Sequence, residues 1–249
     1  MPAINDMNDE IYEQVHSILN DLPEQPRVVE QGIALSVQRE FLEYAEGIDL
    51  NQYSQEDIRA RSQSLFDPGT TLEDKKKALV LLAHSGTVEF YRVIERYVKT
   101  EEGKLKNWGT LALEECRMFL EDSLLDESVG MVITGLGGKD HKLRHFLVVR
   151  ARKGVAFTGP QETITELSFK QVGGRLESVV EQIEFHQTHV TMIVLIPLDV
   201  AVAEFIEGGI HASNQVDDLL DVDYYVRNDR IPTEEEVLRW VQGEEDKAG

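Results

Sequence analysis

Two pairs of histidines have spacings that occur in metal sites of other proteins. His141 and His145 lie four residues apart, and His186 and His189 lie three apart. The sequence around His145 predicts a strand, on which residues four apart stand about 13 Å from each other and cannot chelate one ion. His186 and His189 fall at a predicted helix-to-strand junction, where a capping or exposed imidazole is commoner than a ligand. We therefore predict no metal site and no cofactor.

A glycine-rich loop, Gly135 to Lys139, has the composition of a phosphate-binding loop. A Walker loop has Ser or Thr directly after its lysine, whereas this chain has Asp140. Both nucleotide-binding fingerprints also need a helix next, but the residues from Leu143 onward alternate as in a strand. We interpret the loop as the turn of a β-hairpin.

A run of carboxylates near the C-terminus could gather a divalent cation, which prefers clustered hard oxygens. The run lacks the glycine and the closing glutamate of an EF-hand loop, and Leu219 and Leu220 within it favour a solvated helix end. We interpret these acids as a binding surface for a basic protein partner, formed by Asp217, Asp218, Asp221 and Asp223.

A nucleophile is harder to find. Cys116 follows Glu114 and Glu115, whose charges would raise the pKa of its thiol, and its apolar helical stripe favours core packing. Neither a G-x-S-x-G elbow nor an H-E-x-x-H helix occurs in the sequence. Active sites are also assembled from scattered residues, and the polar candidates near the ends of the predicted strands are Asp140, His141, His189 and Asp199.

The first half of the chain must be helical, because its apolar residues recur three and four positions apart. Ser54 with Asp57 forms a capping-box pattern, which predicts a helix that runs to about Phe66. The apolar stripes of two earlier helices are Ile11, Val15, Ile18 and Leu22, and then Ile33, Val37, Phe41 and Tyr44.

Two further segments repeat at about the period of a helical pair. Lys77-Ala78-Leu79 and Leu111-Ala112-Leu113 occupy equivalent places in the pattern. On these segments the chain resembles HEAT-like helical repeats over about residues 55–122. The resemblance implies a stacked-helix surface for a partner. An irregular helical bundle is the alternative.

The period changes near Val129, where short apolar runs with strand-like alternation begin. The strongest predicted strand is Thr191 to Ile196, and Thr233 with Glu236 caps a last predicted helix. Before that strand, Leu176, Val179, Val180 and Ile183 form the apolar face of a predicted helix. After it, a helix from about Val200 is expected to end at Gly208-Gly209. We therefore expect two domains, an all-helical one over residues 1–125 and an α/β one over residues 126–249. The second should be an α+β fold with helices on a mixed sheet, ferredoxin-like or a related sandwich.

The composition limits the partners and the location. The 249 residues include 25 basic and 46 acidic ones, so the net charge is 25 − 46 = −21, which disfavours direct binding to nucleic acid or to an anionic membrane. Residues 1–10 lack the basic and apolar regions of a secretory signal, and no apolar run approaches the roughly 20 residues of a membrane span. We expect a cytoplasmic protein.

Two functions remain open. The favoured hypothesis is a non-catalytic interaction or adaptor protein that engages a basic partner. Its helical half would present a stacked-helix surface, and its α/β half would supply a second contact or a dimerisation surface. The alternative is an enzyme whose active site lies in the C-terminal α/β domain, near the four polar candidates.

Overall fold

The computed structural model describes residues 26–125 and 130–243, which form two compact units. The helical unit contains residues 36–132, and the α+β unit combines residues 28–35 with those from Ile133 onward. The expected order, a helical region followed by an α+β region, is confirmed. Independent folding of residues 1–125 and 126–249 stays a prediction. The predicted stripe from Ile11 to Leu22 lies outside the described residues.

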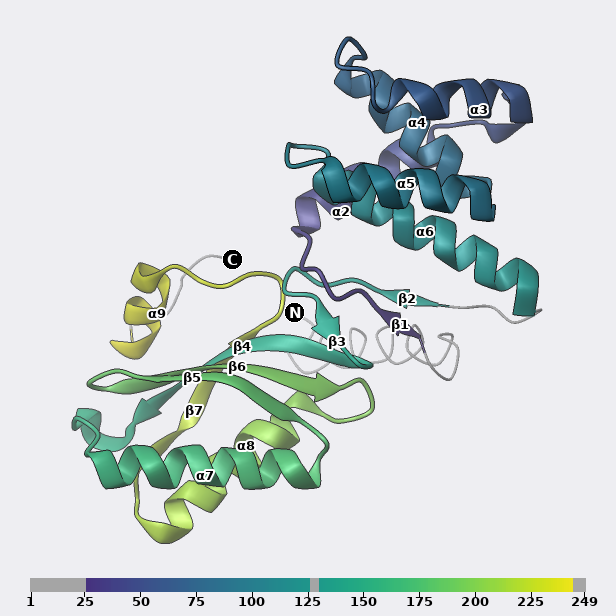
Figure 1. The fold of residues 1–249 in the computed structure, drawn as a ribbon. Coiled ribbons are helices and arrows are strands. Elements are labelled where there is room, and N and C mark those ends of the chain that lie inside the picture. The colour runs from purple at the N-terminus through teal and green to yellow at the C-terminus, as the bar shows by residue number, and fades with distance from the viewer. Residues whose placement is uncertain (1–25, 126–129, 244–249) are drawn as a thin grey trace, which may run out of the picture. The chain divides into compact units, whose positions relative to one another are not determined.

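Over its described residues, the helical unit is built from five α-helices and one 3-10 turn (Figure 1). The predicted capping box is present at the start of α3, where Ser54 and Asp57 exchange both hydrogen bonds. At the starts of the two following helices, the Thr71 and Thr87 side chains each accept one backbone N–H, from Asp74 and Phe90. The elements are α2 (Leu35–Glu46), η1 (Leu50–Gln52), α3 (Gln55–Ser64), α4 (Leu72–His84), α5 (Val88–Thr100) and α6 (Lys106–Leu125).

Helix α4 is the centre of this unit. Six consecutive residues, Ala78 to Ala83, are buried, so this stretch of helix has no solvent-facing side. Helices α3, α5 and α6 pack against α4, and Lys76 on α4 forms an ion pair with Glu40 on α2 at 2.6 Å. The two segments predicted to be equivalent lie on unequal helices, α4 with 13 residues and α6 with 20. The arrangement is that of helices gathered around a central one, not of two repeat copies.

The α+β unit has the element order β4-α7-β5-β6-α8-β7, and its strands lie side by side as β7-β4-β6-β5. Every pairing among these strands is antiparallel, so the predicted mixed sheet is wrong. Helices α7 and α8 cover one face of the sheet, and α9 lies on the other (Figure 1). The elements are β4 (Lys142–Ala151), η2 (Arg152–Gly154), α7 (Gly159–Arg175), β5 (Val179–Phe185), β6 (His189–Pro197), α8 (Val202–Val216), β7 (Leu220–Arg227) and α9 (Glu234–Val241).

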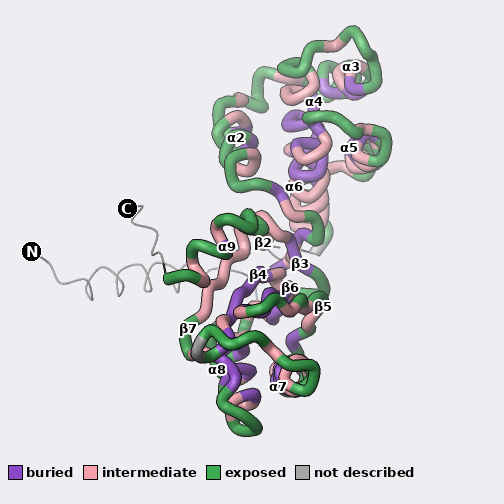
Figure 2. The backbone as a smooth tube through the Cα atoms, turned by 90° about the vertical axis from the view of Figure 1, so that its left-hand side faces the viewer, coloured by how far each residue is buried: buried purple, intermediate pink, exposed green. Residues whose placement is uncertain are grey.

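The central strands are buried on both faces (Figure 2). Leu147 and Val149 of β4 join the core beneath α7 and α8, whereas Phe146 and Val148, which alternate with them, pack under Val237 of α9. This alternation follows from the two-residue period of a strand. The edge strand β5 is mostly exposed on the face away from the helices.

Two predicted helix limits are wrong. The stripe from Leu176 to Ile183 suggested a helix, but α7 ends at Arg175 and β5 begins at Val179. Gly208 and Gly209 were expected to end a helix, but both lie inside α8. Gly209 is needed there because a Cβ would lie 2.4 Å from the ring of Phe169 on α7.

The glycine loop is structural. It leads into a hairpin in which β3 (Gly138–Lys139) pairs with the start of β4, and the turn residues Asp140 and His141 both have positive φ. Phosphate binding needs a following helix, and a strand follows instead. A hairpin is present, but its turn is Asp140-His141 and not the predicted segment Gly135 to Lys139, in which Gly138 and Lys139 form strand β3. The strand before the loop, β2 (Met131–Val132), pairs with β1 (Arg27–Val28).

The loop packs against a segment from far away in the sequence. Val29 and Ile33 are buried in the α+β unit, and the backbone N–H of Gly138 donates to the Val29 carbonyl at 3.0 Å. A Cβ on Gly135 would lie 1.5 Å from the backbone oxygen of Asp229. The glycines therefore allow three backbone segments to approach closely.

We predict that Gly135→Ala lowers the free energy of unfolding by more than about 2 kcal/mol, because the added methyl group forces backbone apart. Urea denaturation measures the loss. The control is Gly174→Ala on α7, where a Cβ meets nothing within 4 Å and stability should rise by about 0.5–1 kcal/mol. Equal effects of the two substitutions would contradict the structural role of the loop.

Candidate functional site

A groove of about 820 Å³ lies on the sheet face that carries α9. Its wall on one side is the start of α9 and the residues before it, and its floor is β4 and β6. The turn between β5 and β6 closes one end. The lining residues are Phe146, Glu184, Phe185, His186, Gln187, Thr188, His189, Thr191, Ile231, Pro232, Glu234, Val237 and Leu238.

The strand period places polar side chains in the floor. Val190 and Met192 of β6 belong to the core beneath α7 and α8, so His189 and Thr191 face the opposite side. Both are buried, with 5% and 9% of their surface exposed. Such buried polar groups are costly unless they are hydrogen-bonded, and their position in a groove is one that a ligand could use.

The wall is held in place by the cap of α9. Thr233 and Glu236 form a capping box, and Arg230 is ion-paired with the Glu236 carboxylate. The Arg230 guanidinium and the Thr233 hydrogen bonds hold the pKa of Glu236 well below its usual range. Farther along α9, the centre of the Trp240 ring lies 4.8 Å from the guanidinium carbon of Arg150 on β4. These contacts fix the helix over one half of the sheet face and leave the other half uncovered.

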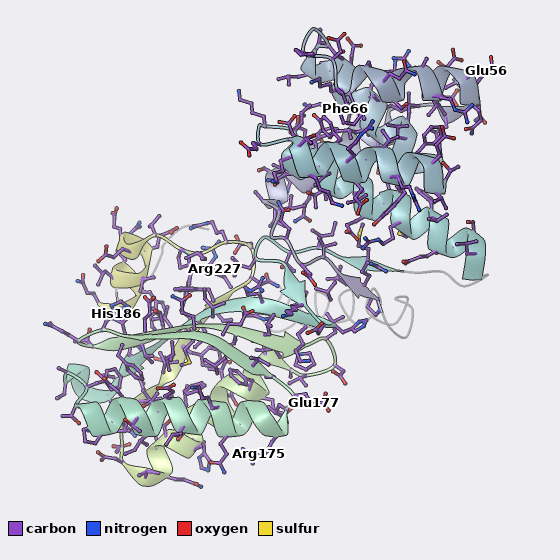
Figure 3. The ribbon with its side chains drawn as sticks, viewed as in Figure 1. Glu56, Phe66, Arg175, Glu177, His186 and Arg227 are labelled. Carbon is purple, nitrogen blue, oxygen red and sulfur yellow. The ribbon has the colours of Figure 1, made fainter. Side chains whose placement is uncertain are left out.

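The turn between β5 and β6 stacks two imidazoles. The backbone N–H of His186 donates to the His189 carbonyl at 2.9 Å, which closes a tight hairpin. The two rings lie 4.3 Å apart with an angle of 9° between their planes. The outer ring belongs to His186, which is exposed at the end of the sheet (Figure 3). Its Nε2 lies 3.4 Å from the Thr191 hydroxyl.

The inner imidazole is neutral at physiological pH. Burial, with a smaller contribution from the neighbouring His186, lowers the pKa of His189 from 6.5 to about 4. Its Nδ1 has no hydrogen-bond partner among the residues that the structure describes. A neutral imidazole carries one N–H and one acceptor nitrogen, so this ring can accept or donate a proton.

The four sequence candidates do not meet in one place. In the β4–β6 register Lys142 pairs with Pro197 at one end and Arg150 with His189 at the other. Eight residue steps separate these ends, or roughly 27 Å at strand rise. Asp140, His141 and Asp199 therefore lie beyond one end of this strand pair, whereas His189 lies in the groove at the other.

The acidic run is paired within the α+β unit. Arg150 contacts Asp221 at 3.3 Å and Asp223 at 2.9 Å. Arg152 is ion-paired with Asp218, and Gln161 donates to Asp217 at 3.2 Å. These carboxylates lie within reach of basic and amide side chains of their own unit.

Other candidates take structural positions. Cys116 is buried, and burial raises the pKa of its thiol to about 11. His145 is also buried, and desolvation lowers the pKa of its ring.

Over residues 26–125 and 130–243, no group of three or more His, Cys, Asp or Glu side chains could hold a metal ion. In the same ranges no helix is long and apolar enough to cross a membrane. A cytoplasmic location stays a prediction.

Sequence reasoning missed most of the groove. It selected His189 but placed it at the end of a helix, because β5 had been interpreted as helical. His186, Thr191, Glu184 and Glu234 line the groove together with it. The two-residue alternation of β6 was the signal that could have placed Thr191 beside His189.

Comparison with known proteins finds solved structures only. No protein-family model matches the chain, and no curated protein does. A protein from Deinococcus radiodurans R1 described as a transposase is 10% identical, with a TM-score of 0.36, over 43% of this chain and 93% of its own. A REP-associated tyrosine transposase bound to a REP hairpin is 11% identical, with a TM-score of 0.31, over 39% of this chain and 61% of its own.

These findings correct three sequence predictions. The HEAT-like resemblance is wrong: α4 lies at the centre of its unit, and the solved structures found are described as transposases. Their description as enzymes contradicts the non-catalytic adaptor function. The hairpin complex contradicts the expected partners, a basic protein and no direct nucleic acid. At these TM-scores the likeness assigns neither an activity nor a ligand to this chain.

The low pKa of His189 predicts a dependence of stability on pH. The unfolded chain takes up this proton near pH 6.5 and the folded chain only near pH 4, so the unfolded state binds more protons between these values. Stability should therefore fall as the pH drops from 6.5 to 4, by no more than about 3 kcal/mol from this group. Urea denaturation across that range should show a weaker pH dependence in His189→Gln than in the wild type.

The matched control for this titration is His211→Gln, which changes an exposed histidine on α8. It should keep the pH dependence of the wild type. An unchanged slope in His189→Gln would mean that this imidazole is not held neutral by the fold.

Proposed function

We propose that the α+β unit is an enzyme whose active site is the groove between α9 and the exposed half of the sheet face. One observation carries the proposal: His189, 5% exposed, lines an 820 Å³ groove with a ring nitrogen that no described residue partners. Buried polar atoms in folded proteins are nearly always hydrogen-bonded, so an unpartnered ring nitrogen of a residue that lines a groove supports a ligand site there.

The chemistry we propose is proton transfer to or from a small bound molecule. His189 is unprotonated at neutral pH, as a general base must be. His186 stacks on it from the solvent side, where it could exchange protons with water. The Thr191 hydroxyl, 3.4 Å from His186 Nε2, would orient that ring.

We further propose that the unit is ferredoxin-like, the finer of our fold predictions. The order β4-α7-β5-β6-α8-β7, with β4 and β6 in the centre of the sheet, supports this arrangement. Its two long helices lie on one face of the sheet, which leaves the other face for α9 and a ligand.

Filling the groove tests the proposal. Leu238 lines it from α9 with 39% of its surface exposed, so Leu238→Trp should occupy the groove without disturbing the core. We predict that compounds from a library of small neutral, cationic and anionic molecules raise the melting temperature of the wild type but not of this variant. Compounds that stabilise the wild type but not Leu238→Trp are then assayed for turnover.

The matched control is Leu167→Trp on α7, where Leu167 is 61% exposed and does not line the groove. This variant should respond to the same compounds as the wild type. If every stabilising compound acts equally on Leu238→Trp, the ligand site lies elsewhere and the proposal fails.

A further inference from the structure

We infer that the groove takes an organic cation with a flat apolar body, such as an aromatic amidine or a protonated nitrogen heterocycle. The inference rests on the proposed function and names its substrate class. It follows from three properties of the lining: the sign of its charges, the positions of its apolar side chains, and the neutral, unpartnered ring of His189.

The charged side chains in the lining are all acidic. Glu184 comes from β5 and Glu234 from α9, so carboxylates approach from both the sheet and the helix. Among the residues that the structure describes, no lysine or arginine lines the groove. Arg150, the neighbour of His189 in the strand register, is held by Asp221 and Asp223. A cation in the groove is therefore attracted from both sides, and an anion is repelled.

The apolar part of the lining suits a planar body. Phe146 provides a ring in the floor, and Val237 packs beside it. Ile231 and Leu238 stand at the wall with 55% and 39% of their surfaces exposed. Large apolar side chains left in solvent beside carboxylates are a surface that an amphipathic ligand can cover.

The imidazole of His189 also favours a cationic ligand. His189 is neutral, so it adds no positive charge that would repel a cation. Its unpartnered nitrogen could accept a hydrogen bond from an N–H of the ligand if the exposed His186 ring moves aside. An amidinium or a protonated heterocycle supplies both the charge and the N–H donor.

Three probes of one shape and different charge test the inference. Benzamidine is cationic, benzamide is neutral and benzoate is anionic at pH 7. Ligand-observed NMR titration of the full chain should give the affinity order benzamidine, benzamide, benzoate. Glu184→Gln and Glu234→Gln should each weaken benzamidine binding about 2- to 5-fold, as expected for exposed charge pairs, and leave benzamide binding unchanged.

Glu235→Gln is the matched control, because Glu235 is the next residue on α9 and does not line the groove. It should leave all three affinities unchanged. If benzoate binds as tightly as benzamidine and Leu238→Trp blocks both, the groove is a ligand site but its preference for cations is refuted. If no probe binds in a way that Leu238→Trp blocks, the inference is refuted, whereas the proposed function fails only if the compound library also gives no stabilisation that Leu238→Trp abolishes.

Discussion

The α+β unit depends on burying β4 and β6 on both faces. These central strands carry apolar side chains in both directions, so one layer of helices is not enough to remove them from water. Helices α7 and α8 bury one face of these strands. On the other face, Val237 of α9 packs on Phe146 and Val148 and removes them from water. Trp240 and Tyr225 pack around this cluster. Without α9 this second cluster would lie in water.

Because α9 is short, it covers the β4 half of that face and leaves the β5 half open. The side chains of the covered half and of the open half differ in polarity. Apolar residues lie under the helix, and His189, Thr191 and Glu184 lie beside it. The groove is thus a consequence of partial cover, and the neutral state of His189 is a consequence of its burial at the edge of the covered region.

The sequence predicted the elements whose signals are local. The apolar run of β6 and the capping boxes at Ser54 and Thr233 were recognisable without tertiary information. The strand β5 was missed because Leu176, Val179, Val180 and Ile183 have helical spacing, whereas only the last three belong to the strand. That error moved His186 and His189 from a hairpin to a helix end and hid the groove.

Other features depend on contacts between distant segments, which periodicity cannot reveal. Val29 and Ile33 precede the helical unit in the chain but are buried in the α+β unit. Gly135 needs its glycine because of Asp229, which lies 94 residues later, since 229 − 135 = 94. The sequence showed a glycine loop, but only the fold shows which backbone it must accommodate.

The groove as a ligand site is the central claim, and the imidazole signals of the histidines test it most directly. In ¹H–¹⁵N NMR spectra of the histidine rings, saturating benzamidine should shift the signals of His186 and His189, which line the groove. The signals of His145 and His211, which do not line it, should stay in place. Shifts confined to His145 or His211, or no shift of His186 and His189 at saturation, would contradict the account.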